Sequence, residues 1–181
     1  MTLAATCARI ELILSDVDGV MTDGGIHVLD DGSQMVTFHI RDGMGVRLWR
    51  EAGKRFGIVT GRKLEAIRRR AADLWLDIVQ LGVDDKLPAV DSIAAELMLS
   101  RDQVCYIGDD LLDLATIRAV GLGVAVADAV EDVRRAAKYT TSVPGGRAPV
   151  REVVELILKN TGRWDDVLQR YRSNDRMTSD E

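Results

Sequence analysis

The chain has 181 residues and a mass of 19.9 kDa, which suits one domain and leaves little room for a second. Hydrophobic residues make up 46% and charged residues 29% of the chain, the balance of a soluble globular protein, which excludes collagen-like, coiled-coil, low-complexity and disordered classes. The net charge of −5 at pH 7 excludes a general nucleic-acid binder, because phosphate backbones require a basic surface.

Apolar runs and helical patterns alternate along the chain. Strands are predicted at 10–15, 55–59, 77–81, 103–107, 122–126 and 138–141. Helices are predicted at 43–53, 62–74, 85–98, 110–119, 128–136, 147–160 and 164–171. Such alternation is typical of a parallel sheet covered by helices on both faces. The predicted fold class is therefore a doubly wound α/β fold.

Residues 24–40 break this alternation directly after the first strand. The pair Asp31-Gly32 lies between two strand-like runs, and a DG pair in that position predicts a β-hairpin. We expect the hairpin to be an insertion in a single catalytic domain that spans 1–172. The polar stretch 173–181 is predicted to be a flexible tail.

The cysteines and the lack of long apolar runs bear on location. Cys7 and Cys105 lie far apart in sequence, and Cys105 sits in the apolar run VCYIG, so we expect free thiols and no disulfide framework. No apolar run approaches the roughly 18 residues of a membrane span. The N-terminal segment lacks the charged start of a signal peptide. A cytoplasmic protein without membrane contact is the prediction.

Polar residues follow three of the predicted strands, and carboxyl ends of parallel strands share one edge of a sheet. The residues concerned are Asp16, Asp18, Thr60, Gly61, Arg62, Asp109 and Asp110, and Lys86 stands where a helix should begin. Four carboxylates at one edge repel each other unless a cation lies among them. Oxygen ligands without nearby His or Cys favour Mg²⁺.

A site with Mg²⁺, a lysine and a hydroxyl group suits a phosphate. In that setting Asp16 can attack phosphorus to give an aspartyl-phosphate. Asp18 lies two residues on, and therefore on the same side of an extended chain, where it can protonate the leaving oxygen and later activate water.

The whole constellation resembles the haloacid dehalogenase superfamily. The motifs that carry the resemblance are DVDGVMTDG (16–24), TGR (60–62), Lys86 and GDDLLD (108–113). The resemblance implies that Asp16 is the nucleophile and Asp18 the general acid and base. The second Asp of the first motif also separates phosphotransferases from dehalogenases, which favours a phosphatase.

The resemblance further implies roles for the remaining motif residues. Thr60 and Lys86 would hold the phosphoryl group. Asp109 would bind Mg²⁺ together with Asp16 and the carbonyl oxygen of Asp18, and Asp110 would orient the metal site. Competing interpretations are a surface lysine for Lys86, helix N-caps for Asp109 and Asp110, and a helix-surface or outer-shell acid for Asp113.

Superfamily members often carry a cap domain between these motifs. Here 44 residues separate Asp16 from Thr60 and 26 separate Thr60 from Lys86, which is room for the hairpin and single helix–strand units only. An open site needs cover to exclude water. We expect a neighbouring subunit to supply it, through the exposed apolar residues of the hairpin.

The chain also resembles, more narrowly, the 3-deoxy-D-manno-octulosonate 8-phosphate (Kdo 8-phosphate) phosphatases. The matching stretches are DVDGVMTDG, FHIRDGMG (38–45), IVTGRK (58–63), GDDLLDL (108–114), VGLGVAVADA (120–129) and GGRAPVREVVELIL (145–158). The resemblance implies hydrolysis of Kdo 8-phosphate to Kdo and inorganic phosphate in lipopolysaccharide biosynthesis. It also implies a homotetramer assembled through the hairpin 24–40.

The implied substrate is acidic, and Arg forks suit carboxylates, so Arg62, Arg147 and Arg151 are candidates for binding it. Pro149 departs from the family pattern and is expected to start a helix.

Three alternatives stay open. Phosphatases of sialic-acid-type nonulosonate 9-phosphates have much the same motifs. A non-catalytic oligomerisation domain, like those attached to acidic-sugar nucleotidyltransferases, would show no phosphate release on any sugar phosphate. A macromolecular phosphate substrate would be favoured by a monomer in solution, because a capless site is open.

Overall fold

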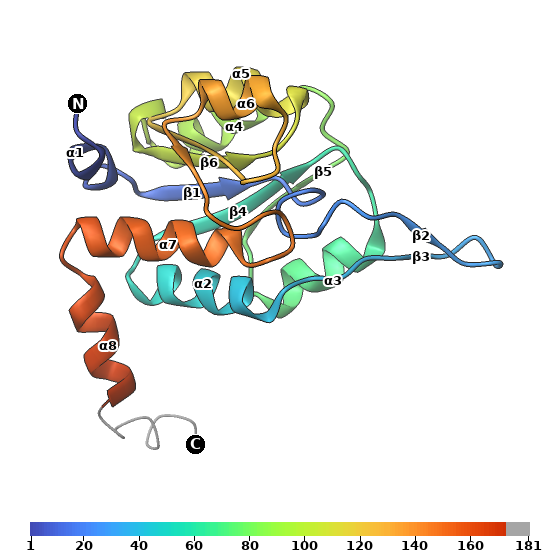
Figure 1. Ribbon diagram of the computed structural model, residues 1–181, viewed down its shortest axis with the longest axis horizontal. Coiled ribbons are helices and arrows are strands. Elements are labelled where there is room, and N and C mark those ends of the chain that lie inside the picture. Colours follow the sequence, from blue (N-terminus) through green and yellow to red (C-terminus); the bar gives the residue numbers. More distant parts are fainter. Residues whose placement is uncertain (173–181) are drawn as a thin grey trace.

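The computed structural model describes residues 1–172, and the tail predicted at 173–181 lies outside the described residues. A six-stranded sheet in the order β5-β4-β1-β6-β7-β8 forms its centre, and every pair of neighbouring strands is parallel (Figure 1). The strands are β1 (Leu12–Ser15), β4 (Arg55–Thr60), β5 (Ile78–Leu81), β6 (Val104–Gly108), β7 (Leu122–Ala125) and β8 (Tyr139–Thr140). The predicted doubly wound α/β class is confirmed.

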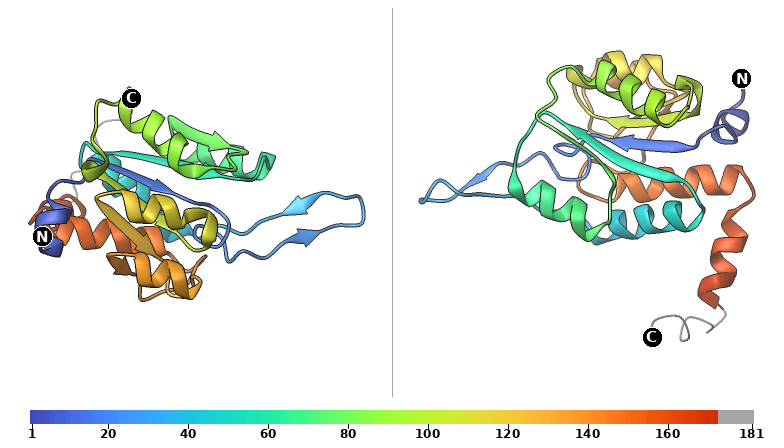
Figure 2. Two further views of the ribbon diagram at one scale, coloured as in Figure 1. Left: turned by 90° about the horizontal axis from the view of Figure 1, so that it is seen from above. Right: turned by 180° about the vertical axis from the view of Figure 1, so that it is seen from behind.

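Helices cover both faces of this sheet. In Figures 1 and 2, α2, α3 and α7 lie on one face and α4, α5 and α6 on the other. The helices are α1 (Leu3–Cys7), α2 (Ile40–Glu51), α3 (Glu65–Asp73), α4 (Lys86–Glu96), the 3-10 turn η1 (Arg101–Gln103), α5 (Leu111–Ala119), α6 (Glu131–Ala136), α7 (Pro149–Asn160) and α8 (Trp164–Arg172). No described helix is both long and apolar enough to cross a membrane.

The central strands are buried on both sides, which explains their unbroken apolar sequences. Every residue of β1 and of β6 is buried. Register places Ser15, the last residue of β1, opposite Ile58 of β4 and Ile107 of β6. The polar residues that follow these strands therefore emerge at one edge of the sheet. Both cysteines, Cys7 and Cys105, are free thiols as predicted, and both are buried, which was expected for Cys105 only.

Helices α2, α3 and α6 each begin three residues away from the predicted start, and α1 was not predicted at all. Helix α2 begins at Ile40 because the His39 side chain accepts a hydrogen bond from Arg41 N at 3.2 Å. Helix α3 begins only at Glu65, since Arg62 N donates to Thr60 Oγ1 at 3.2 Å and the chain turns there. These side-chain bonds override the apolar periodicity on which the sequence boundaries rested.

The hairpin is a short antiparallel pair, β2 (His27–Val28) with β3 (Gln34–Met35), that projects from the body (Figure 2). Its turn contains the predicted Asp31-Gly32 pair, with Ser33 N donating to Asp31 Oδ1 at 2.9 Å. The paired strands are shorter than the predicted span 24–40, because each contributes two residues. Exposed apolar side chains mark the hairpin: Ile26, Val28, Leu29 and Met35.

Helix α7 has an unusual N-terminus. Its cap residue, Ala148, has a left-handed backbone (φ 73°) and makes no side-chain cap bond, while Pro149 occupies the first turn as predicted. The buried Asp42 of α2 substitutes for a cap, with Oδ1 accepting from Arg151 N at 3.0 Å. Burial raises the pKa of Asp42 to about 7, against the opposing effect of hydrogen bonds from the backbone at Arg151 and Val150.

The loop before α7 packs against the loop after β1. Gly146 N donates to Val20 O at 2.9 Å. A Cβ at Gly145 would lie 2.0 Å from Gly19 O, so this close approach requires glycine. The C-terminal part of the chain thus holds the loop that carries the first motif.

Candidate active site

Asp16 stands at the first position after β1. Its backbone N donates to Ile107 O at 2.9 Å, and Ser15 Oγ donates to its carbonyl oxygen at 2.6 Å. The side chain is buried, and burial, together with the charge of Asp113, raises the pKa of Asp16 to about 6. The nucleophile candidate is therefore fixed by the sheet itself.

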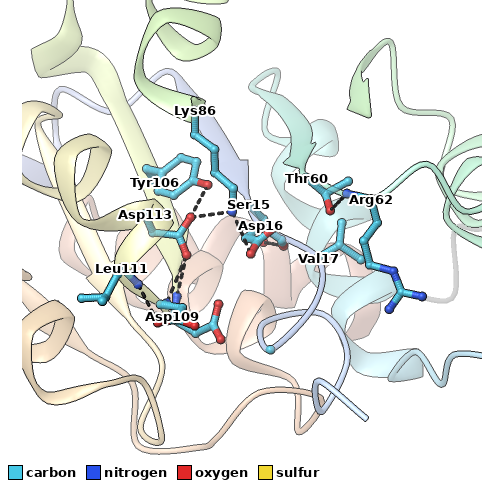
Figure 3. A network of polar contacts seen from close by, with 12 residues as sticks. Ser15, Asp16, Val17, Thr60, Arg62, Lys86, Tyr106, Asp109, Leu111 and Asp113 are labelled. Carbon is cyan, nitrogen blue, oxygen red and sulfur yellow. Dashed lines mark hydrogen bonds and ion pairs between the residues drawn. The ribbon is translucent and has the colours of Figure 1, made fainter. Parts of the chain in front are cut away.

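Lys86 is the first residue of α4 and points into the site rather than to solvent. It is 3% exposed, and its Nζ lies 2.8 Å from Asp16 Oδ2 and 2.7 Å from Asp113 Oδ1 (Figure 3). Burial acts to lower the pKa of Lys86, but the two carboxylates outweigh it and raise the pKa above its usual value. The surface-lysine interpretation of Lys86 is wrong.

Asp113 organises the site, although sequence analysis placed it on a helix surface or in an outer shell. It is fully buried, and its Oδ1 accepts from Lys86 Nζ and from Tyr106 OH, each at 2.7 Å. Its Oδ2 accepts from Asp109 N at 2.9 Å and from Asp110 N at 3.3 Å (Figure 3). The helix-surface interpretation is therefore wrong and the outer-shell one fits.

A sequence signal for Asp113 existed, because it follows the N-cap Asp110 at capping-box spacing. Tyr106 had no such signal, since its ring lies in an apolar strand and only its hydroxyl reaches Asp113.

Asp109 reaches across to the loop after β1. A Cβ at Gly19 would lie 2.0 Å from Asp109 Oδ2, and the φ of Gly19 is +82°, so both space and backbone require glycine there. Burial first, then the charges of Asp16 and Asp113, raises the pKa of Asp109 to about 8. Negative charge accumulates here beyond what Lys86 neutralises.

We call Asp16, Lys86, Asp109 and Asp113 the carboxylate cluster. Oxygen atoms of its three Asp residues all lie within 4.8 Å of one another. The oxygens of Asp113 are already occupied by four donors, which leaves those of Asp16 and Asp109 for a cation. An all-oxygen set with excess negative charge fits Mg²⁺.

Two of the four predicted metal carboxylates lie elsewhere. Asp110 is exposed and caps α5, with Leu111 N donating to its Oδ1 at 2.7 Å, so the N-cap interpretation holds for it. The Asp18 carboxylate is bound by Arg62, whose Nη1 lies 2.9 Å from Oδ1. The metal role implied for Asp18 involves its carbonyl oxygen, which this pairing leaves untouched.

Thr60 ends β4 beside Asp16 and Val17 (Figure 3). It is buried, and its hydroxyl oxygen shapes the turn through Gly61 by accepting from Arg62 N. The other candidate arginines, Arg147 and Arg151, lie at the start of α7.

These two arginines line, with Arg41, a cavity of about 420 Å³ whose lining includes no member of the carboxylate cluster. Arg151 is already paired with Glu155 at 2.7 Å. Arg62 lines a different cavity, so the three predicted substrate arginines do not all converge on one point.

The chain is similar in sequence to known hydrolases. Residues 70–144 match the model of a haloacid dehalogenase-like hydrolase family. The 3-deoxy-D-manno-octulosonate 8-phosphate phosphatase of Yersinia pestis is 42% identical over 151 residues, which are 83% of this chain and 81% of that protein.

Solved structures of such phosphatases have the same fold. One from Moraxella catarrhalis, in complex with a magnesium ion, a phosphate ion and KDO, superimposes with a TM-score of 0.91 at 34% identity, over 93% of this chain and 97% of that one. The cobalt-bound enzyme from Haemophilus influenzae gives a TM-score of 0.84 at 35% identity, over 87% and 92% of the two chains.

Proposed function

This chain belongs to the 3-deoxy-D-manno-octulosonate 8-phosphate phosphatases of the haloacid dehalogenase-like hydrolase family, and from that premise we propose that it is a Mg²⁺-dependent phosphatase that hydrolyses Kdo 8-phosphate to Kdo and inorganic phosphate. One observation carries the proposal: the carboxylate of Asp16 is held 2.8 Å from a buried lysine, next to Asp109, at the carboxyl edge of the sheet. A phosphate monoester needs a nucleophile and positive charge at one point, and this edge supplies both.

In the first step an oxygen of Asp16 attacks phosphorus and the bond from phosphorus to the sugar oxygen breaks. Asp18 gives its proton to that leaving oxygen, which departs as the alcohol of Kdo. Lys86 and Thr60 are the proposed partners of the phosphoryl oxygens. In the second step Asp18 takes a proton from water, which attacks the aspartyl-phosphate and releases inorganic phosphate and Asp16.

Asp16, Asp109 and the carbonyl oxygen of Asp18 are the proposed holders of Mg²⁺, with Asp110 and Asp113 orienting them. The ion, when bound, neutralises charge on the phosphoryl group. Asp113 fixes Lys86 and the backbone of Asp109, so the ligands are positioned before substrate arrives.

A substrate panel tests this function. We expect Mg²⁺-dependent phosphate release from Kdo 8-phosphate, with a higher kcat/KM than from a nonulosonate 9-phosphate or a phosphopeptide. Faster release from the nonulosonate 9-phosphate would assign that substrate instead. No release from any sugar phosphate, with or without Mg²⁺, would leave a non-catalytic oligomerisation domain as the function.

For the sugar carboxylate we propose Arg147 and Arg151, in the cavity that they share with Arg41 at the start of α7. A guanidinium fork binds a carboxylate through two parallel hydrogen bonds. Because this cavity is lined by no member of the carboxylate cluster, the site that binds the acid would be completed between two copies of the chain.

We also propose a homotetramer in which the hairpin 24–40 of one subunit covers the site of another. The exposed apolar side chains of Ile26, Val28, Leu29 and Met35 support this assembly, because exposed apolar patches of this kind mark interfaces. A solution mass of four chains, measured by light scattering, is the expected result; a monomer would contradict it.

The proposed compartment is the cytoplasm, where free thiols such as those of Cys7 and Cys105 stay reduced. The same proposal includes a single catalytic domain over 1–172. It also includes a role in lipopolysaccharide biosynthesis, which follows from the proposed substrate alone.

A further inference from the structure

Arg62 connects three parts of the site that are far apart in sequence. Its Nη1 donates to Asp18 Oδ1 at 2.9 Å, and its Nη2 donates to the side-chain oxygen of Gln34 in the hairpin. Its backbone is fixed as well, because its N–H bonds to Thr60 Oγ1 and its carbonyl oxygen accepts from Gly82 N. The guanidinium is therefore presented from a rigid turn.

The Asp18 carboxylate is held from one side only. Oδ1 is occupied by Arg62, whereas Oδ2 is buried and has no hydrogen-bond partner among the described residues. A buried acceptor without a partner is costly in a folded protein, and such an atom marks a place where a ligand group belongs. Oδ2 is thus the oxygen left without a partner from the protein.

We propose that Arg62 is the positioning residue of the general acid and base: it fixes the plane of the Asp18 carboxylate so that Oδ2 faces the leaving oxygen, and through Gln34 it makes this placement depend on the hairpin. The inference rests on the proposed function, because it concerns the same reaction. It gives Arg62 a different role from the substrate-carboxylate ligand that the sequence suggested.

The hairpin end of the link is built into the fold. Gly32, Ser33 and Gln34 of the hairpin line a cavity of about 540 Å³ together with Arg62 and the residues that lead into α3. Arg62 thus borders this cavity together with the hairpin, while its guanidinium also binds Asp18. The hydrogen bond from Arg62 to Gln34 therefore links the hairpin to the arginine that holds Asp18.

A comparison of leaving groups separates this role from the alternatives. Kdo 8-phosphate and mannose 6-phosphate both release an alkoxide that needs a proton, but only the first has a carboxylate. 4-Nitrophenyl phosphate releases a phenolate that leaves without a proton. The value of kcat/KM reports the steps up to loss of the leaving group, so it isolates proton donation by Asp18 from hydrolysis of the aspartyl-phosphate.

We expect Arg62→Met to lower kcat/KM about 10²-fold for both sugar phosphates, since misplacing a proton donor costs that much, and to leave 4-nitrophenyl phosphate within a few-fold of wild type. Gln34→Ala should show the same pattern with a few-fold loss, and Arg62→Lys should recover part of the activity. Arg69→Met, which removes an exposed arginine of α3 that pairs only loosely with Glu65 at 3.5 Å, is the matched control.

Other patterns overturn the inference. A loss confined to Kdo 8-phosphate would make Arg62 a carboxylate ligand, and an equal loss on all three substrates would make it a phosphate ligand or a structural residue. If Arg62→Met does not fold, as judged by thermal unfolding, Arg62→Lys and Gln34→Ala decide by the same pattern. A wild-type protein inactive on all three substrates would refute the proposed function, and this inference with it.

Discussion

The carboxylate cluster and the hairpin distribute their side chains in opposite ways. The cluster buries charge: Asp16, Lys86 and Asp113 are each less than a tenth exposed. The hairpin exposes apolar groups, with Ile26 65% and Val28 64% exposed. Both arrangements are unfavourable for an isolated chain, since buried charges need partners and apolar surface favours burial. Under the proposed function a cation and a phosphate would complete the cluster, and a second copy of the chain would cover the hairpin.

The largest expected effect concerns the cluster. Asp16→Asn removes the attacking oxygen anion, so turnover of Kdo 8-phosphate should fall by at least about 10⁴-fold. The fold should survive, because Asn fills the same volume and one buried charge is lost. Phosphate release and thermal unfolding measure the two outcomes, with the exposed Asp165→Asn as control. Retained activity would show that Asp16 is not the nucleophile.

Lys86→Met tests whether the cluster depends on its one cation. The substitution leaves the carboxylates of Asp16 and Asp113 buried and unneutralised, so we expect a loss of about 3–5 kcal/mol in the free energy of unfolding. Urea denaturation measures it. Adding Mg²⁺ should restore part of the loss, because the ion binds the folded state alone. An unchanged midpoint would mean that solvent already screens the cluster.

The hairpin is tested by charging its apolar face. The double variant Ile26→Asp with Val28→Asp should reduce the solution mass below that of the proposed tetramer, and kcat/KM should fall about tenfold or more as the proposed cover is lost. Thermal stability of the isolated chain should change little, because both side chains are exposed. Met98→Asp, at a 92% exposed position away from the hairpin, is the control for added charge. An unchanged mass would place the interface elsewhere.

Asp42 provides the last test and a contrast to both regions, because its buried carboxylate accepts hydrogen bonds from the backbone and lies within the electrostatic influence of Arg70. Its pKa is about 7 in the folded chain against an ordinary value of 3.8. Between pH 3.8 and about 7 the carboxyl group of Asp42 is protonated in the folded state and ionised in the unfolded state. The free energy of unfolding therefore falls as the pH rises through this range, and Asp42 causes no further change above it.

Asp42→Asn keeps the acceptor for Arg151 N and removes the titration. We therefore expect the variant to gain on the order of 1–3 kcal/mol over wild type at pH 8 and nothing at pH 4, as measured by urea denaturation at both values. An equal difference at both pH values would show that Asp42 does not titrate in this window.

The fold was predictable from the sequence where signals are local. Buried strands have continuous apolar sequences, and polar residues follow where these strands end. The positions of Asp16, Thr60 and Asp109 at one edge of the sheet could therefore be predicted, whereas their roles came from the family resemblance. The Asp31-Gly32 turn was predictable for the same reason, because two adjacent residues specify it.

What escaped prediction depends on contacts between distant residues. The burial of Asp113 follows from Lys86, 27 positions away, and the pairing of Asp18 with Arg62 spans 44. The start of α7 depends on Asp42, 109 positions from its bond partner Arg151. No periodicity encodes such pairs, since each arises only when the sheet brings its strands together.

The cap that Asp42 provides for α7 has a consequence for the order of folding. The cap residue of α7 makes no side-chain bond, so the N-terminus of this helix depends on a side chain of α2 for its capping bond. The loop that leads into α7 then closes Gly145 onto Gly19 beside the nucleophile. A nascent chain truncated before that point would contain every proposed catalytic residue and still lack the support of its nucleophile loop. During synthesis from the N-terminus, we therefore expect this loop to gain its support only after Gly145 and Gly146 have been made.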